Sequence, residues 1–295
     1  MRKFIVSDLH GNLNMYCSII SYLENLYKDD ELMLYINGDL IDRGRYSAKM
    51  LLDVKDRIEN KRNFDIKYLA GNHELMMYQA SLKIKDGIWP RYSGWYLNGG
   101  LVTLNSLQTL TTLKEQLNII KFISELDVYY KFKEKLNDKQ IVLVHARCPK
   151  EVNDTCDVKI KDNNANVSKM VWTREEDLSF ILKESLGNKN YFTIIGHTVV
   201  SDEKGYKYDG EYNIINIDGG CAAYAVGRFE YNHTPLVEID DKNDRLIILT
   251  FNNNNEIIHA NYFTNRQSIK LSNNELEKKK KYIEKNIRRK KLEYM

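Results

Sequence analysis

The sequence predicts an α/β protein in which short buried strands alternate with amphipathic helices, followed by a region that is mostly β. Six apolar runs are rich in β-branched residues, as expected for strands buried on both faces, and each run ends in a polar turn. After the first run, Met15, Ile19 and Leu23 share one face of a helix. A chain of 295 residues with only three prolines can form one large domain. The six runs are residues 3–7, 32–36, 66–69, 141–144, 191–195 and 214–217.

The later elements follow from the same patterns. Two further apolar runs, residues 236–239 and 245–251, flank a polar turn, which favours an antiparallel hairpin. Apolar residues at helical spacing over residues 48–58 predict a helix after the second run. Further helices are expected over residues 73–84, 113–132 and 175–186, and the second of these is expected to carry no chemistry.

Composition favours a cytoplasmic protein without a membrane span. No apolar window approaches the length needed to cross a bilayer, and the first apolar run is too short for a signal peptide. The four cysteines lack the C-x-x-C spacing of a zinc or redox pair, so we expect reduced thiols with structural roles. They are Cys17, Cys148, Cys156 and Cys221.

Histidines gather at the ends of the predicted strands. Four of the six histidines directly follow apolar runs, and aspartate and asparagine residues accompany them. In an α/β fold, ligands bind where strands end at the carboxyl edge of the sheet. A mixture of imidazole and hard oxygen ligands without thiolates suits Mn²⁺, Fe or Zn²⁺ in an open, water-bearing site. The residues concerned are Asp8, His10, Asp39, Asp42, Asn72, His73, His145 and His197.

The spacing of these residues favours a site for two metal ions. Asp8 and His10 alternate by two, so one strand end can direct both at one ion. Asp39 follows a neighbouring strand and can bridge to a second ion, to which the amide of Asn72 offers a neutral oxygen. Two divalent ions roughly 3.5–4 Å apart can hold a hydroxide in line with a phosphorus atom.

Three motifs carry a resemblance to the calcineurin-like metallophosphoesterases: DLHGN at 8–12, GDLIDRG at 38–44 and GNHE at 71–74. The second and third are similar to the phosphoprotein-phosphatase branch. The chain also resembles bacterial and phage serine/threonine phosphatases and the symmetrical diadenosine tetraphosphatases. Weaker similarities lie in VHA at 144–146, WTRE at 172–175 and GHT at 196–198.

The resemblance implies a calcineurin-like β-sandwich of mixed sheets flanked by helices, with a helical insert. It implies two divalent ions, with Mn²⁺ expected and Fe or Zn²⁺ as alternatives. The first ion would be held by Asp8, His10 and Asp39. The second would be held by Asp39, Asn72, His145 and His197.

The same resemblance implies the catalytic roles. His73 would protonate the leaving alkoxide, and Asp42 would keep its imidazolium charged and oriented. Arg43 and Arg174 would clamp the phosphate oxygens, because a planar guanidinium forms two parallel charge-assisted bonds. Asn72 would also lie against the substrate.

Some positions depart from the family pattern or leave two interpretations open. Ser7 stands where the phosphatase branch has glycine, and HAR at 145–147 differs from the eukaryotic HGG, which weakens the case for a protein substrate in particular. Trp89 and Trp95 either pack the insert onto the core or form an aromatic wall that contacts substrate.

The C-terminal residues form a separate basic segment. Residues 275–293 hold nine lysine or arginine residues and four glutamates, although the whole chain carries a net charge of only +3. We therefore expect a metallophosphoesterase domain over residues 1–270 and a basic helical tail over residues 271–295. The tail is expected to be a solvated helix, with contact to nucleic acid or an acidic partner as the alternative.

Three functions follow, in order of preference. The first is hydrolysis of phosphomonoesters, namely phosphoserine or phosphothreonine in proteins, by attack of a hydroxide held between two ions. The second is cleavage of a dinucleoside polyphosphate or an RNA 5′ end at the same site. The third is a metal-binding scaffold without activity, against which the complete set of ligands and catalytic residues argues. The sequence does not fix the oligomeric state.

Overall fold

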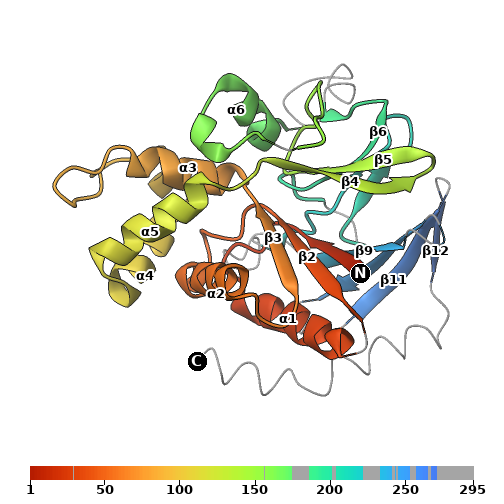
Figure 1. Ribbon diagram of the computed structural model, residues 1–295, viewed down its shortest axis with the longest axis horizontal. Helices are drawn as coiled ribbons and strands as arrows, with labels where there is room; N and C mark the ends of the chain where they lie inside the picture. Colours follow the sequence, from red (N-terminus) through yellow and green to blue (C-terminus); the bar gives the residue numbers. More distant parts are fainter. Residues whose placement is uncertain are drawn as a thin grey trace.

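The computed structural model describes most of the chain, and the fold is built from two β-sheets with helices on their outer faces (Figure 1). The predicted helix over residues 175–186, except Leu186, and the predicted C-terminal tail lie outside the described residues. So does Cys156. The described residues are 1–28, 30–155, 157–174, 186–200, 204–221, 233–240, 243, 245–252, 257–264 and 267–270.

The first sheet has the strand order β12-β11-β10-β9-β1-β2-β3. Strands β1, β2 and β3 are parallel and joined by helices, as the alternating apolar runs predict. The predicted late hairpin is confirmed, because β9 and β10 pair antiparallel, and β9 also pairs with β1. The strands are β1 (Arg2–Val6), β2 (Leu32–Asn37), β3 (Asp65–Leu69), β9 (Thr234–Asp240), β10 (Arg245–Phe251), β11 (Ile257–Thr264) and β12 (Gln267–Lys270).

The second sheet has the order β4-β5-β6-β8-β7, with a parallel centre and an antiparallel strand at each edge. Its strands are β4 (Tyr129–Leu136), β5 (Lys139–Val144), β6 (Tyr191–Ile195), β7 (Lys207–Asp209) and β8 (Ile214–Asn216). The two mixed sheets with flanking helices confirm the predicted fold class.

Alternation along the strands divides the core into two layers. In β1, Ile5 points between the sheets, where it joins Tyr35 and Leu143, whereas Phe4 and Val6 face the helices. Each fully buried aliphatic side chain contributes about 1.5–3 kcal/mol, whereas an exposed ion pair contributes about 0–1 kcal/mol. Apolar packing between the sheets therefore outweighs the surface ion pairs in holding the two halves together.

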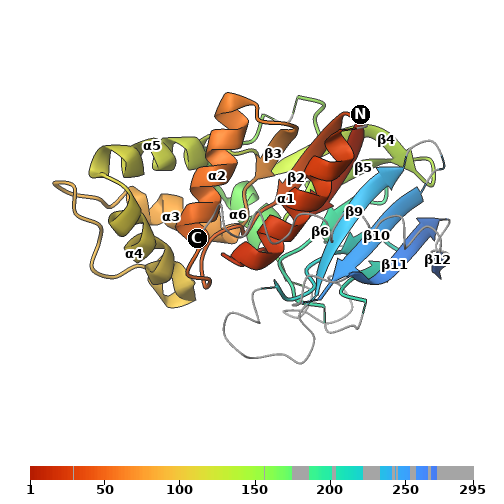
Figure 2. The same cartoon turned by 90° about the horizontal axis from the view of Figure 1, so that it is seen from below.

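Helices α1 (Leu13–Tyr27) and α2 (Ser47–Asn60) cover the outer face of the first sheet (Figure 2). Helix α1 begins at Asn12, whose side chain accepts a hydrogen bond from the Met15 amide and so satisfies one free N–H group. Helix α6 (Ala165–Trp172) lies over the second sheet, and a 3₁₀ turn, η2 (Ile160–Asp162), precedes it.

A helical insert extends from the end of α3 (Asn72–Ser81) to β4, and it lies at the end of the molecule away from β9–β12 (Figure 1). It contains a π-helical turn η1 (Tyr96–Gly100), α4 (Leu101–Leu110) and α5 (Leu113–Ser124). The prediction of helix throughout residues 113–132 is wrong at its end. Residues 129–132 belong to β4, because pairing with β5 gives this stretch a strand partner that local spacing does not reveal.

No helix among the described residues is long and apolar enough to cross a membrane. Three of the cysteines, Cys17, Cys148 and Cys221, are buried, and no disulfide joins them to one another in the described part of the chain.

Candidate dimetal centre

The carboxyl ends of β1, β2, β3, β5 and β6 meet at one edge of the sandwich. The site residues lie in the loops that follow these strands, except Asn72 and His73, which begin helix α3. Tight turns there place several non-glycine residues at positive φ, a conformation that costs of order 1–3 kcal/mol each. Such a concentration of strain at one edge indicates a functional site. The residues are Asp8 (φ 56°), His10 (φ 42°), Asp39 (φ 50°), Asp42 (φ 74°), Arg43 (φ 65°) and His197 (φ 69°).

Asp39 is the centre of the arrangement. Its Oδ2 lies 3.4 Å from Nε2 of His10, and its Oδ1 lies 3.4 Å from Nε2 of His145. Potential ligand atoms of Asp39, His10 and His73 lie within 4.8 Å of one another, and so do those of Asp39, His145 and His197. Asp39 belongs to both groups, so it is the residue that would be shared if each group held an ion.

Glu74 fixes the position of Asp39 through hydrogen bonds to the backbone. Its carboxylate accepts hydrogen bonds from the backbone amides of Asp39 (2.9 Å), Leu40 (3.2 Å) and Gly71 (2.8 Å) and from the Tyr68 hydroxyl (2.6 Å). Gly71 is required because a Cβ there would come within 2.2 Å of the Asp39 carboxylate. The loops after β2 and β3 are therefore locked together.

Backbone carbonyls orient the imidazoles. Nδ1 of His10 donates to the Ile41 carbonyl (2.9 Å), and Nδ1 of His145 donates to the Asn37 carbonyl (2.8 Å), so each Nε2 faces Asp39. Metal-binding histidines in general use the second nitrogen in this way. His197 is reversed: its Nε2 donates to the Trp172 carbonyl (3.2 Å), which leaves a lone pair on Nδ1.

The buried Nδ1 of His197 has no hydrogen-bond partner within the described part of the chain. A buried polar atom without a partner costs free energy unless something else satisfies it. A ring nitrogen of His197 lies within 4.8 Å of the potential ligand atoms of Asp39 and His145. Asn72 supplies a neutral oxygen there, with its Oδ1 3.2 Å from Nε2 of His145. The donor set therefore fits a divalent metal ion.

Asp8 lies beside the same cluster. Its carboxylate accepts hydrogen bonds from the Ser7 hydroxyl (2.5 Å) and from the His197 amide (3.1 Å to Oδ2). Burial raises the pKa of Asp8 to about 6, although His145 acts in the opposite direction. Ser7, at the position where the phosphatase branch has glycine, thus contacts a predicted ligand directly.

The charges of the cluster are strongly coupled. Burial alone would lower the pKa of His145, but the Asp39 and Asp8 carboxylates raise it to about 10. Conversely, His145 and His73 hold the pKa of Asp39 well below its usual range despite its burial. Burial and the neighbouring His145 lower the pKa of His197 to about 2, so its nitrogen is available as a ligand at every ordinary pH.

A second group of residues lies against the cluster. Nδ1 of His73 donates to Oδ2 of Asp42 (2.7 Å), and Nε2 of His73 accepts from the Arg43 guanidinium (3.1 Å). The His73 ring packs edge-on against His10, with the ring centroids 4.6 Å apart. This places the predicted acid, its carboxylate partner and one predicted phosphate clamp together.

The ionisation of His73 differs from the expectation. The sequence predicts that Asp42 keeps the imidazole charged, but burial lowers the pKa of His73 to about 4, and Arg43 adds to this effect. Burial likewise raises the pKa of Asp42 to about 7, against the hydrogen bonds from Thr103 and Trp95. Burial therefore outweighs the attraction between the two partners.

Arg174 reaches the other side of the cluster. Its Nη1 donates to the His197 carbonyl (3.3 Å), which places the half-buried guanidinium next to a predicted ligand. Thus all nine predicted site residues from Asp8 to His197 gather at one edge of the fold, together with Arg174.

Other site residues were not assigned by sequence. Asp218 lies two residues after the end of β8 and is buried near Asp8, and burial raises its pKa to about 7. Its position after an apolar strand, shared with Asp8 and Asp39, was a signal that could have identified it. Trp95 and Thr103 both donate to Asp42, and nothing in their local sequence indicates this. Trp95 is 1% exposed, so it packs inside the protein rather than forming a wall for substrate.

Residues 1–198 match the family of calcineurin-like phosphoesterases. Among solved structures, a serine/threonine phosphatase from Saccharomyces cerevisiae with similarity to human phosphatase PP5 aligns with a TM-score of 0.54 at 14% identity, over 85% of this chain and 80% of the other. A cold-active protein-tyrosine phosphatase from a psychrophilic Shewanella species aligns with a TM-score of 0.50 at 17% identity, over 84% and 77% of the two chains. No curated protein matches the sequence significantly.

The two structural similarities show a shared fold, and the family match extends over more than half of the 295 residues. The protein is therefore a metallophosphoesterase, an enzyme of the hydrolase class. It belongs to the calcineurin-like phosphoesterase family.

Proposed function

We propose that this enzyme hydrolyses phosphoserine or phosphothreonine in proteins with the help of two divalent ions. The observation that carries the proposal is the position of Asp39 within both groups of potential metal ligands, next to the His73–Asp42 pair. Two bound ions would lower the pKa of a shared water and so supply the nucleophile for attack on phosphorus. Their ligands would be Asp8, His10, Asp39, Asn72, His145 and His197, and we expect Mn²⁺, with Fe or Zn²⁺ as alternatives.

The protein's own residues bind the phosphate and move the proton. Arg43 and Arg174 approach the cluster from its two sides, so their guanidinium groups can neutralise phosphate oxygens. When Arg43 turns from His73 to a phosphate, the lone pair on Nε2 of His73 is freed to take up a proton from solvent, and the resulting imidazolium can give that proton to the leaving oxygen. The phosphate dianion also offsets the effect of burial and favours the charged imidazole.

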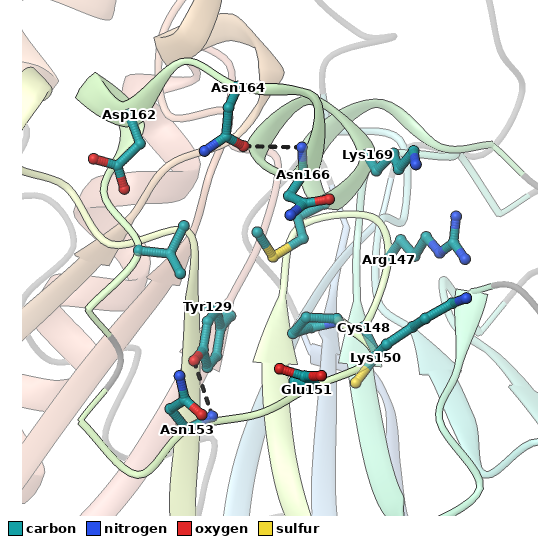
Figure 3. Close-up of a pocket in the computed structure, with 13 residues that line it drawn as sticks. Tyr129, Arg147, Cys148, Lys150, Glu151, Asn153, Asp162, Asn164, Asn166 and Lys169 are labelled. Carbon is teal, nitrogen blue, oxygen red and sulfur yellow. Dashed lines mark hydrogen bonds between the residues drawn. The ribbon is translucent and has the colours of Figure 1, made fainter.

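A cavity beside the site supports a substrate larger than a phosphate. It has a volume of about 480 Å³, and Arg147, Lys150 and Lys169 lie along one side of it (Figure 3). Within the part of the chain that the structure describes, no carboxylate pairs with these three cations. Asp162 and Asn164 lie on the opposite side, and Glu151 also lines the cavity, so it offers anionic and neutral polar contacts besides the three cations.

This cavity adjoins the loops that carry two of the imidazoles. Arg147 follows His145 by two residues, and the Ala146 and Arg147 amides both donate to the Met170 carbonyl in α6. Helix α6 ends at Trp172, whose carbonyl orients His197. A peptide that places its phosphate at the ions can therefore extend acidic residues toward Arg147 and Lys169.

A parallel assay tests the proposal. The purified protein is reconstituted with Mn²⁺ and given an acidic phosphoserine peptide and diadenosine tetraphosphate at equal concentration. We expect metal-dependent release of inorganic phosphate from the peptide with the higher kcat/KM. A higher kcat/KM for the dinucleotide would replace the proposed substrate with the alternative one, and inactivity on both with full metal content would indicate a scaffold.

A further inference from the structure

The Asp42 carboxylate is held by two side chains of the helical insert. Nε1 of Trp95 donates to Oδ2 (2.7 Å), the same oxygen that accepts from Nδ1 of His73. The Thr103 hydroxyl donates to Oδ1 (2.6 Å) and accepts from the Asp42 amide (3.0 Å). Asp42 and Thr103 are fully buried, so no solvent contact can replace these bonds.

These bonds restrict how Asp42 can turn. Both oxygens have a donor from the insert, and the backbone of Asp42 is itself at positive φ, so its orientation depends on its partners. Rotation of the carboxylate would break at least one hydrogen bond at a fully buried position, where an unpaired polar group is costly. The direction of the His73 ring follows, because Asp42 accepts from its Nδ1.

The insert is in turn fixed against the core. The Trp95 ring packs against Trp89, with ring centroids 5.5 Å apart, and Gly100 lies so close that a Cβ would come within 2.3 Å of Trp95 Nε1. The Gly99 carbonyl accepts from the Arg43 amide (3.2 Å). One turn of the insert therefore contacts both the partner of the proposed acid and the backbone of a proposed phosphate clamp.

We propose that Trp95 and Thr103 are positioning residues that hold Asp42 so that Nε2 of His73 points at the leaving oxygen of the substrate. The inference rests on the proposed role of His73 as the general acid. The insert is then part of the proton-delivery apparatus, although its residues do not contact the ions or the phosphate. The contribution of the insert to kcat should depend on the leaving group of the substrate, because a good leaving group departs without needing a proton.

The experiment compares Trp95→Phe, Thr103→Val and Thr103→Ser with the unchanged protein on a series of aryl phosphates of rising leaving-group pKa. We expect kcat on the poorest leaving groups to fall roughly 10–100-fold for the first two variants, because each loses a hydrogen bond to a charged group. On the best leaving groups, kcat should change less than about threefold, and Thr103→Ser should retain most activity because it keeps the hydroxyl.

Trp89→Phe is the matched control. Trp89 is buried in the same layer and donates to Gln116 (3.1 Å) rather than to Asp42. The Trp89→Phe variant should be less stable, but its kcat should depend on the leaving-group pKa no more steeply than that of the unchanged protein. The inference would be overturned if Trp95→Phe and Trp89→Phe lost kcat equally on all leaving groups. It would also be overturned if the dependence of kcat on leaving-group pKa were unchanged in Thr103→Val.

His73→Asn, measured on the same series of aryl phosphates, distinguishes a failure of the positioning role of Trp95 and Thr103 from a failure of the proposed acid role of His73. If His73→Asn steepens the dependence on the leaving group and the Trp95 and Thr103 variants do not, the positioning role fails and the proposed acid stands. If His73→Asn leaves the dependence unchanged, the proposed acid itself is wrong. Should Trp95→Phe fail to fold, the nearly isosteric Thr103→Val tests the same bond network.

Discussion

The guanidinium of Arg43 lies 3.1 Å from Nε2 of His73, so the proposed phosphate clamp and the proposed acid are in contact before any substrate is present. The arrangement keeps the imidazole neutral, because Nε2 accepts from a permanently charged donor. Binding of a phosphate would give Arg43 a stronger partner and would leave Nε2 able to carry a proton.

Replacement of Arg43 tests this arrangement. Arg43→Ala should lower kcat/KM for a phosphopeptide by roughly 10–100-fold, since a hydrogen bond to a charged group contributes about 1.5–3 kcal/mol. Inhibition by inorganic phosphate should weaken in parallel, as measured by steady-state kinetics. Arg45→Ala is the control, because the exposed Arg45 lies over the Tyr46 ring and away from His73. Unchanged phosphate inhibition in Arg43→Ala would contradict the clamp.

Replacement of His73 separates acid catalysis from metal binding. His73→Asn should lower the rate on substrates with poor leaving groups by roughly 10²–10⁴-fold, the usual contribution of a general acid. The metal content, measured by elemental analysis, should stay near two ions per chain. Loss of an ion would instead make His73 a ligand, a role that its position beside His10 and Asp39 also allows.

Metal binding should strengthen as the pH rises. The pKa of His145 is raised to about 10, so Nε2 carries a proton near neutral pH that an ion must displace. Between pH 7 and 9 the apparent affinity should rise roughly tenfold per unit for each proton released. Titration calorimetry in buffers of different ionisation enthalpy measures that release directly.

Two variants identify the residue that releases the proton when a metal ion binds. His145→Asn should reduce the pH dependence of metal binding. His197→Asn should weaken binding without changing that dependence, because the pKa of His197 is lowered to about 2 and the imidazole is already neutral. The same slope in both variants would show that another group supplies the proton.

Replacement of Glu74 should lower both the stability of the protein and its metal content. Glu74→Gln places an amide among the backbone N–H groups of Asp39, Leu40 and Gly71, which leaves at least one of them unpaired at a cost of about 1–3 kcal/mol. Thermal unfolding should show this loss, and the metal content should fall because Asp39 is no longer fixed.

Glu115 supplies a matched control, because it also caps the start of a helix but is exposed. Glu115→Gln should cost at most about 1 kcal/mol and leave the metal content unchanged. Full metal content in Glu74→Gln would remove Glu74 from the support of the site.

The cavity beside the site predicts a preference for acidic substrates. The double variant Arg147→Gln/Lys169→Gln should raise KM for a phosphopeptide with acidic flanking residues several-fold, because it removes two cations from one side of the cavity. Turnover of a small aryl phosphate should be unchanged, and Lys114→Gln on the exposed face of α5 is the control. Equal kinetics on acidic and neutral peptides before and after the change would exclude this contact.

The sequence predicted the parts of the molecule that local pattern determines. The strands that end at Asp8, Asp39 and His145 are short apolar runs followed by polar turns, and they lie in the structure as predicted. The helix expected to continue to residue 132 shows the limit, because β4 exists through its pairing with β5.

The bonds that complete the site join residues remote in sequence. Trp95 donates to a carboxylate 53 positions away, and Thr103 to one 61 positions away. No periodicity encodes such contacts. They follow from how the insert packs, and so does the burial that lowers the pKa of His73 to about 4, against the expectation from its carboxylate partner.

The left-handed backbone at Asp8, His10, Asp39, Asp42, Arg43 and His197 has an evolutionary consequence. Each of these positions would relax if it mutated to glycine, so a descendant that no longer needed the reaction would gain robustness by discarding its machinery. The six side chains at this edge therefore carry a cost in backbone free energy of order 1–3 kcal/mol each, which glycine would avoid.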